Sequence, residues 1–444
     1  MEMDWNKQGD EAVARLQAML KFDTTNLPGN ERALAEFLAD ELRREGLNPQ
    51  VLEAAPERGN LLIRLKGDGS LRPLLLMSHL DVVPAEPAHW THPPFSGTLA
   101  DGYVWGRGAI DSKLTGATQL QVLLLCHRLG LKLKRDLVLV ATADEERGAT
   151  YGMKWLVDNY PEWFDAEYGL NEAGGFALMV DGTPVYTCQV AEKGSAPYDI
   201  VAHGKPGHSS VPHADNAIAH LGQALGKLGA GLMPHRVPLC VRAFFESLAS
   251  GLPHLKTVLN DVLIPEKSDA ALSALPVDDA TRLMFQAMVR NTSAPTMLEA
   301  GVKRNVIPSL ARAQLSGRPL PGIDEATFEH EVRQLIGNGV DLELTEPFRS
   351  GVAFHDQTPL FDVICNSMQA IEPHSIVAPY MQTGGTDARF LTNRDIQVYG
   401  FVPMRYEPGL DFFALCHGHN ERISVANVQF AVRVLFDIVQ KLSM

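Results

Sequence analysis

Residues 74–81 read Leu74-Leu75-Leu76-Met77-Ser78-His79-Leu80-Asp81. An apolar run of this length, closed by polar residues, is typical of a parallel β-strand that is buried on both faces. Functional side chains of open α/β sheets lie just beyond the carboxyl ends of such strands. Because His79 and Asp81 are two residues apart, a continuing strand would turn both side chains to the same face. This pair fits a metal ligand with an orienting carboxylate, but taken alone it favours two surface residues after a core strand.

The composition favours a soluble globular protein with two or three domains. The chain has 444 residues, of which 45% are hydrophobic and 21% are charged. Its net charge of -14 argues against a nucleic acid or an anionic membrane as a partner. The same charge disfavours a strongly acidic substrate, unless a local basic patch receives it.

The first residues and the cysteines predict a cytoplasmic location. The start, Met1-Glu2-Met3-Asp4-Trp5-Asn6, has neither the basic segment nor the apolar core of a signal peptide, and no long apolar run spans a membrane. The five cysteines are odd in number and far apart, which fits reduced thiols: Cys126, Cys188, Cys240, Cys365 and Cys416.

Strands alternate with helices in the first part of the chain. A second buried strand covers residues 136–142 and ends before Asp144-Glu145-Glu146, and a short strand over 168–171 ends before Glu172. The apolar spacing predicts a helix over 113–129 between the first two strands. This order predicts the α/β class, with a mostly parallel sheet flanked by helices.

The pattern changes near Gly194, where a β-α-β-β-α-β order begins. We expect a catalytic domain in two parts, residues 1–193 and 351–444, interrupted by an α+β domain of the split-βαβ type at 194–350. Extra sequence at about 232–295 predicts mostly helices. Ser424 is the expected N-cap of a final helix that runs through Leu442.

Five candidate ligands follow strands or lie in tight loops: His79, Asp111, Glu146, Glu172 and His417. Two imidazoles and three carboxylates suit a pair of zinc-like ions that share one carboxylate. Two metal ions held in this way, about 3.5–4 Å apart, serve hydrolysis. Glu145 precedes Glu146 and points another way at a strand end, so it can stay free as a general base.

Five ordered motifs make the chain resemble a known family. They are Ser78-His79-Leu80-Asp81-Val82-Val83-Pro84, Trp105-Gly106-Arg107-Gly108-Ala109-Ile110-Asp111, Ala143-Asp144-Glu145-Glu146, Asn171-Glu172-Ala173-Gly174-Gly175 and His417-Gly418-His419-Asn420-Glu421. The chain resembles the aminoacylase, carboxypeptidase G and succinyl-diaminopimelate desuccinylase family of di-zinc amidohydrolases and exopeptidases. That resemblance implies a zinc-exopeptidase-like fold, an inserted lid and dimerisation domain, and two divalent ions, with zinc expected first and cobalt or manganese as alternatives.

The resemblance also implies a role for each motif residue. Asp111 would bridge the two ions. His79 and Glu172 would complete one metal site, and Glu146 and His417 would complete the other. Asp81 would orient His79, and Glu145 would be the catalytic base.

The inserted domain and a later loop carry further matches. Gly204-Lys205-Pro206-Gly207-His208 resembles the family segment whose histidine stabilises the oxyanion, usually in the partner subunit. The substrate contacts that the resemblance implies are Asn305, Arg318, Gly385 and Thr386. Two features depart from the family pattern: Ser112, which follows the bridging acid, and the extra segment near 232–295, which puts the dimer in question.

We therefore expect a metal-dependent hydrolase that cleaves an amide or peptide bond next to a free carboxylate, of the carboxypeptidase or dipeptidase type. An N-acyl-amino-acid amidohydrolase is the alternative within this class. A catalytically silent metal-binding homologue is the alternative from another class, and a pure interaction module would require the strand-end acids to be coincidental. The expected partners are a small peptide or N-acyl amino acid and a second copy of the chain, with no nucleic acid and no membrane.

Overall fold

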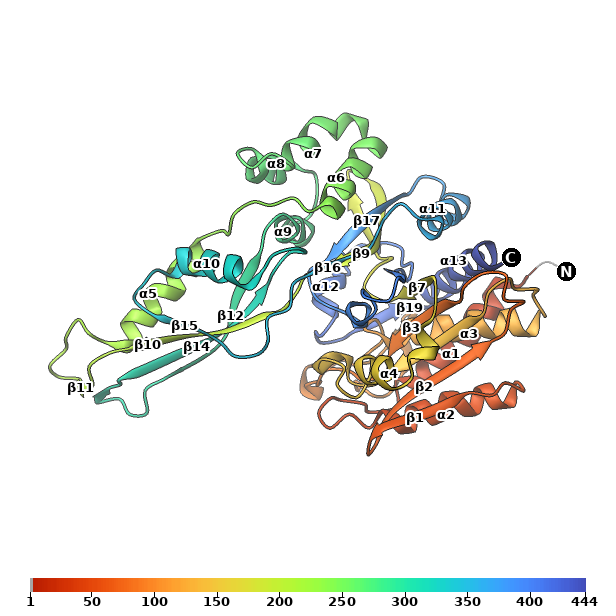
Figure 1. Cartoon of the computed structure of the whole chain (residues 1–444), viewed down its shortest axis with the longest axis horizontal. Coiled ribbons are helices and arrows are strands. Elements are labelled where there is room, and N and C mark those ends of the chain that lie inside the picture. The colour runs from red at the N-terminus through yellow and green to blue at the C-terminus, as the bar shows by residue number, and fades with distance from the viewer. Residues whose placement is uncertain (1–2) are drawn as a thin grey trace. The chain divides into compact units, whose positions relative to one another are not determined.

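The computed structural model describes residues 3–444. These residues form two compact units. The first comprises residues up to Val190, Phe354–Tyr380 and Thr386–Met444, and the second comprises Ala191–Ala353 and Met381–Gly385. The predicted inserted domain, 194–350, falls within the second unit. Each unit is described in turn below (Figure 1).

The first unit is built on one twisted sheet. Its strands follow the order β1-β2-β6-β3-β7-β18-β9, and β8 and β17 also pair with β9. The strands are β1 (Gln50–Ala55), β2 (Arg58–Leu65), β3 (Leu74–His79), β6 (Leu137–Thr142), β7 (Tyr168–Asn171), β8 (Ala177–Val180), β9 (Thr183–Glu192), β17 (Ile376–Gln382) and β18 (Gln397–Gly400). A small separate sheet joins β4 (Thr98–Ala100), β5 (Tyr103–Trp105) and β19 (Arg422–Ser424).

The four central strands of the main sheet are joined by parallel pairing. β6, β3, β7 and β18 run parallel to one another, whereas β1, β2 and β9 pair antiparallel with their neighbours. The outer strands differ because β1 and β2 form a hairpin, and hairpins are antiparallel by construction. The predicted α/β class is confirmed, with its parallel part where the site residues were expected.

Helices cover both faces of this sheet. The helices of the first unit are α1 (Trp5–Met19), α2 (Glu31–Arg44), α3 (Lys113–Arg128), α4 (Met153–Asn159), α11 (Pro359–Ile371), α12 (Phe412–Leu415) and α13 (Val425–Ser443), with short 3-10 turns η1 (Pro87–His89), η2 (Glu145–Arg147), η3 (Pro161–Phe164) and η5 (Asp387–Phe390). α1, α3 and α13 pack together against one face, and α4 and η5 pack on the other. All positions of β3 and β6 are buried, as expected for strands covered on both sides.

The second unit has the predicted β-α-β-β-α-β order. An antiparallel sheet runs β12-β14-β10-β15, and α5 and α10 cover one face of it (Figure 1). The elements are β10 (Ala196–His203), β11 (Gly207–His208), α5 (Ala217–Ala230), β12 (Thr292–Ala300), β13 (Val306–Ile307), β14 (Leu310–Arg318), α10 (Glu325–Ile336), β15 (Asp341–Leu344) and β16 (Val352–Ala353). Between α5 and β12 lie α6 (Leu239–Gly251), η4 (Pro253–Leu255), α7 (Lys256–Val262), α8 (Ser268–Ala274) and α9 (Asp279–Met288).

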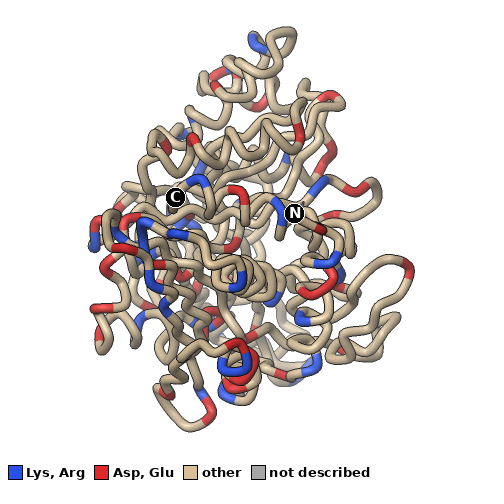
Figure 2. Tube along the Cα trace, turned by 90° about the vertical axis from the view of Figure 1, so that its right-hand side faces the viewer, with Lys and Arg blue, Asp and Glu red and all other residues tan. Residues whose placement is uncertain are grey.

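Across residues 3–444, none of the helices combines the length and the apolar character that crossing a bilayer requires. Acidic and basic residues are interspersed along the traced chain (Figure 2).

Candidate metal centre

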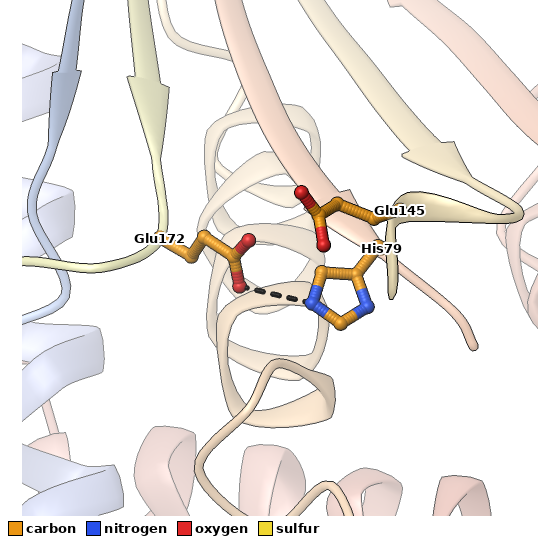
Figure 3. A group of neighbouring side chains, drawn as sticks. All are labelled: His79, Glu145 and Glu172. Carbon is orange, nitrogen blue, oxygen red and sulfur yellow. Dashed lines mark ion pairs between the residues drawn. The ribbon is translucent and has the colours of Figure 1, made fainter. Parts of the chain in front are cut away.

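Three neighbouring parallel strands of the first unit end at one place. β6, β3 and β7 lie side by side. β6 ends shortly before Glu145 and Glu146, β3 ends at His79, and β7 ends directly before Glu172. Because parallel strands end at the same edge of a sheet, these residues converge although the sequence separates them by up to 93 positions, from 79 to 172. In Figure 3 the carboxylates of Glu145 and Glu172 are both directed at the His79 ring.

The loop before α3 brings Asp111 to the same edge. One buried carboxylate, that of Glu421, holds this loop by accepting hydrogen bonds from the backbone N–H groups of Gly108, Ile110 and Asp111 at 2.9, 2.7 and 3.1 Å. Three backbone donors converging on one carboxylate fix the loop in a single conformation. The position of Asp111 therefore depends on Glu421.

The same network places His417. Arg107 donates to Glu421 at 2.7 Å and to the backbone oxygens of His417 and Gly418 at 3.1 and 2.9 Å. The loops that carry Asp111 and His417 are thus joined through one buried ion pair. Their side chains meet, although 306 positions separate 111 from 417 in the chain.

The Nε2 atom of each imidazole faces two carboxylates, and Asp111 contacts both rings. His79 Nε2 lies 3.0 Å from Asp111 Oδ1 and 3.1 Å from Glu172 Oε2. His417 Nε2 lies 3.1 Å from Asp111 Oδ2 and 3.3 Å from Glu146 Oε1. Each set therefore holds one imidazole and two carboxylates, and the two oxygens of Asp111 are divided between the sets.

The electrostatics of this cluster favour cations. Burial, together with the charge of Asp111, raises the pKa of Glu146 to about 7. Hydrogen bonds with Asp111 and Glu146 raise the pKa of His417 to about 10. For the buried His79, desolvation is outweighed by the charge of Glu172 and by nearby carboxylates, so its pKa is also raised. The neighbouring carboxylates raise the pKa of both imidazoles, so the cluster favours positive charge. Imidazole and carboxylate groups are also the ligands that divalent ions such as zinc bind in proteins.

Ligand atoms also lie close enough to share an ion. Within residues 3–444, the atoms of His79, Asp111 and Glu146 lie within 4.8 Å of one another, and so do those of His79, Glu145 and Glu172. The second group would make Glu145 a ligand. The Glu145 carboxylate is also paired with Arg389, at 3.3 Å.

Glu145 is largely shielded from water and has charged neighbours of both signs. Burial raises its pKa well above the ordinary value; Arg389 opposes this rise and Asp387 adds to it. Arg389 also donates to the backbone oxygen of Thr386 at 2.9 Å, and Asp387 accepts a hydrogen bond from Thr142 at 2.7 Å. A carboxyl group with a raised pKa can both accept and return a proton near neutral pH.

Asp81 fixes the turn that carries both glutamates. Its carboxylate accepts hydrogen bonds from the backbone N–H groups of Glu145 and Glu146 at 3.0 and 3.2 Å, and from Asn26 Nδ2 at 2.8 Å. The ring nitrogen Nδ1 of His79 lies 2.9 Å from the backbone oxygen of Asp81 and 3.5 Å from its carboxylate. Asp81 thus contacts His79 mainly through its main chain, and its side chain organises η2.

Three residues beside the cluster have left-handed backbone without being glycine. Asp144, Ala173 and His417 have φ values of 65°, 67° and 62°. Such conformations cost free energy in ordinary residues and concentrate at functional sites. Asp144 directly precedes Glu145, Ala173 directly follows Glu172, and the third residue, His417, is itself a predicted ligand.

Thr386 belongs to the first unit, whereas the other four residues predicted for substrate or oxyanion contacts lie in the second. Thr386 Oγ1 accepts hydrogen bonds from Asn171 Nδ2 at 3.1 Å and from the N–H of Ala388 at 3.2 Å, which caps η5. The second unit holds the exposed His208 in β11, the exposed loop residue Asn305, the half-buried Arg318 at the end of β14, and Gly385. The part these residues play in catalysis stays a prediction.

Five residues of the site were given no role from the sequence, and Arg389, the partner of Glu145, is one of them. Arg107 and Glu421 stand inside motifs that the resemblance singled out, and Asp387 directly follows the predicted substrate contact Thr386, so the signal for them was present. Asn26 bridges Asp81 and the Asp144 carboxylate, at 2.8 and 2.9 Å, from an irregular loop with no pattern of its own. Nothing local in the sequence indicates it.

Known proteins resemble this chain along almost its whole length. The sequence pattern of peptidase family M20/M25/M40 matches residues 75–441. An N-fatty-acyl-amino acid synthase/hydrolase of Danio rerio is 31% identical over 460 aligned positions, covering 98% of this chain and 86% of that protein. Aminoacylase-1 of Sus scrofa is 28% identical over 428 positions, covering 94% and 91%.

Solved structures share the fold at lower identity. Human carnosine dipeptidase 1 superposes with a TM-score of 0.71 at 16% identity, covering 99% of this chain and 97% of that one. A dinuclear metal binding peptidase of the M20 family from Bacillus subtilis superposes with a TM-score of 0.60 at 13% identity, covering 98% of each chain.

Proposed function

The chain belongs to peptidase family M20/M25/M40, and we propose that it hydrolyses an amide or peptide bond next to a free carboxylate. The observation that carries this proposal is Asp111, whose two carboxylate oxygens face two imidazoles from opposite ends of the chain. A carboxylate divided in this way suits a pair of divalent ions, and paired ions serve hydrolysis.

The proposed ligands follow the two donor sets. One ion would be held by His79, Glu172 and Asp111, and the other by His417, Glu146 and Asp111. Imidazole and carboxylate donors suit zinc first, with cobalt or manganese as alternatives. Divalent ions in these positions would supply Lewis acidity, which lowers the pKa of water and polarises a substrate carbonyl.

The protein's own residues supply the proton transfer. Glu145 would take a proton from the attacking water and return it to the departing amine, a role that suits a buried carboxylate with a raised pKa. Arg389 would hold the Glu145 carboxylate in place through their ion pair. Asp81 would keep η2 fixed through the two backbone N–H groups that it binds.

The remaining roles rest on the family resemblance. We propose that His208 stabilises the oxyanion of the tetrahedral intermediate. The proposed substrate contacts are Asn305, Arg318, Gly385 and Thr386. An arginine suits the free carboxylate because its planar fork can donate two parallel hydrogen bonds.

Two substrate classes fit this proposal. The name of the Danio rerio relative favours an N-acyl amino acid, and peptides ending in a free carboxylate carry the same bond and the same charge. We expect turnover of at least one class in a panel of dipeptides, longer C-terminal peptides and N-acyl amino acids, measured with added zinc or cobalt. Chelation should abolish it.

A catalytically silent homologue would behave differently in that panel. It would bind metal and turn over none of the substrates. Activity that persists unchanged after chelation and dialysis would contradict the metal-dependent mechanism. Re-addition of the metal after chelation is the control for unfolding, because it should restore turnover.

We also propose that the chain forms a homodimer through the edge of the second unit's sheet. β12 is one of the two edge strands of this sheet, and it is exposed from Ala294 to Ala300, including Leu298 with 64% of its surface accessible. An unpaired apolar edge favours pairing with a symmetry mate. Light scattering should give a dimer, and Leu298→Arg should give a monomer, whereas Leu283→Arg on exposed α9 should leave the dimer intact. A monomeric unmodified protein would contradict this assembly.

A location in the cytoplasm is proposed as well. All five cysteines are free thiols, which fits a reducing compartment.

A further inference from the structure

A network of buried polar side chains leads from the N-terminal part of the first unit to η2. It links Glu31, the first residue of α2, to Arg58 at the start of β2 and then to Asp144, which directly precedes η2. Glu31, Arg58 and Asp144 expose only 0%, 5% and 4% of their surfaces. Charged residues are seldom buried to this extent unless they are paired. The ion pairs are therefore part of what holds this region together.

The guanidinium group of Arg58 joins two carboxylates. Its Nε and Nη2 atoms donate to the two oxygens of Glu31, each at 2.8 Å, and Nη2 also donates to Asp144 Oδ1 at 3.0 Å. A planar fork that binds one carboxylate through two parallel hydrogen bonds has a fixed orientation. Glu31 therefore sets the direction in which Arg58 reaches Asp144. Gly29 leaves room for this fork, because a Cβ atom there would lie 2.5 Å from Arg58 Nε.

Asp144 is the residue at which the chain turns from β6 into η2. Its backbone is left-handed, with a φ of 65°. Its Oδ1 atom accepts hydrogen bonds from Arg58 and from Asn26 Nδ2, the latter at 2.9 Å, and its Oδ2 atom accepts one from the backbone N–H of Tyr151 at 3.1 Å. A left-handed conformation costs free energy in a residue other than glycine, so it persists where the surroundings hold it. Arg58 and Asn26 are such surroundings.

Asn26 joins the network to Asp81. Its amide nitrogen donates to Asp81 Oδ2 at 2.8 Å as well as to Asp144. Asp81 in turn accepts the backbone N–H groups of Glu145 and Glu146. The two carboxylates that hold η2 are thus bridged by one amide, and Arg58 anchors them to Glu31 in α2.

We infer that Arg58 is a positioning residue for catalysis, which acts on the geometry of η2 through Asp144 and Asn26. The inference rests on the proposed function, in which Glu145 is the base and Glu146 is a metal ligand. Two adjacent residues can keep these separate roles only while the turn that carries them keeps one conformation. Arg58 itself takes no part in bond cleavage.

Replacing Arg58 with methionine is expected to lower kcat about 10–100-fold, the range in which partners of metal ligands contribute to activity. KM should stay within about threefold, because substrate binding does not involve Arg58. Arg58→Lys keeps the charge and loses the fork, so it should recover part of the lost kcat. Steady-state kinetics on the best substrate of the panel measure both constants. An unchanged kcat for folded Arg58→Met would overturn the inference.

Amide hydrogen exchange follows the turn without turnover. The N–H groups of Glu145 and Glu146 are bonded to Asp81, and such bonds slow exchange for as long as the turn stays closed. We expect Arg58→Met to speed exchange in residues 143–149 and to leave exchange in α13 unchanged. Mass spectrometry of the full-length, metal-containing protein measures both segments. A lower kcat without faster exchange in 143–149 would overturn the inference, because the effect would not act through the turn.

A merely structural arginine would give another pattern. Arg58→Met would then lower the Tm and speed exchange in α13 as much as in residues 143–149, and the folded fraction would keep its kcat. Arg64→Met is the matched control, because Arg64 lies on the same strand and pairs with Asp136 at 3.1 Å, opposite the start of β6. It should leave both kcat and the exchange of 143–149 unchanged. If Arg58→Met does not fold, Asn26→Leu, which removes the bridging amide and keeps the size, is scored by the same two measurements.

Failure of this inference is distinguishable from failure of the proposed function. If no amide is hydrolysed, the proposed function is wrong, and the exchange of residues 143–149 still reports whether Arg58 holds the turn. If amides are hydrolysed and Arg58→Met matches the unmodified protein in kcat and in exchange, the function stands and the positioning role does not.

Discussion

Replacing Glu145 with glutamine is expected to lower kcat about 10²–10⁴-fold, the range that general acid–base catalysis contributes. The side chain keeps its size and can still contact Arg389, but it can no longer accept a proton from water. KM should change little, because Glu145 is not assigned to substrate binding. Steady-state kinetics on the best substrate of the panel measure both constants.

Metal content separates the role of Glu145 from that of a ligand. If Glu145 is the base, Glu145→Gln retains the metal content of the unmodified protein, whereas a ligand variant loses part of it. Glu162→Gln, at an exposed position in η3, is the matched control and should be fully active. Full activity of Glu145→Gln would remove this residue from the mechanism.

Replacing Asp111 with asparagine is expected to reduce activity to the background of the assay. Asp111 faces both imidazoles, so one substitution disturbs both donor sets, whereas a change at Glu172 or Glu146 disturbs one. The amide keeps the shape and removes the charge, and its nitrogen is a poor ligand. Kinetics with and without excess zinc measure how far added metal compensates.

The fold of Asp111→Asn needs its own control. Asp111 is held through its backbone N–H by Glu421, and that bond survives the substitution. We therefore expect a normal far-ultraviolet circular dichroism spectrum and a cooperative unfolding transition. Asp165→Asn, at an exposed position, should leave activity unchanged. Substantial turnover by a well-folded Asp111→Asn would exclude a shared bridging carboxylate.

The sequence alone predicted the parts of this molecule that repeat a local pattern. The apolar run before His79 and the runs before Glu145 and Glu172 read as buried strands, and parallel strands meet at one edge. The family membership is confirmed, and the α/β class with it. His417 follows no strand; it was placed in the same group from its loop before the final helix, and the family resemblance then assigned it to one of the two metal sites.

The supporting contacts could not be read from the sequence because they are made across long separations. Asn26 binds Asp81 across 55 positions, and Arg389 pairs with Glu145 across 244. Asn26 lies in a loop and Arg389 in the short 3-10 turn η5, and neither segment has a periodicity that indicates burial or direction. Only the packed fold brings such partners together.

The buried Lys193 shows a second reason for incomplete prediction. A lysine beside a glycine at a strand end is typical of a solvated turn, and most lysines are exposed. Its burial follows from the pairing of β12 with β14 and from the residues around Arg290. Composition and spacing carry no information about that pairing.

The metal content of the purified protein tests the central claim most directly, namely that His79, Asp111, Glu146, Glu172 and His417 hold a pair of ions. Elemental analysis by mass spectrometry, after dialysis against buffer with trace zinc, gives the number of ions per chain. We predict two ions per chain for the unmodified protein and fewer than one for Asp111→Asn. A fully active protein that holds no metal, or an Asp111→Asn variant that holds both ions, would contradict the account.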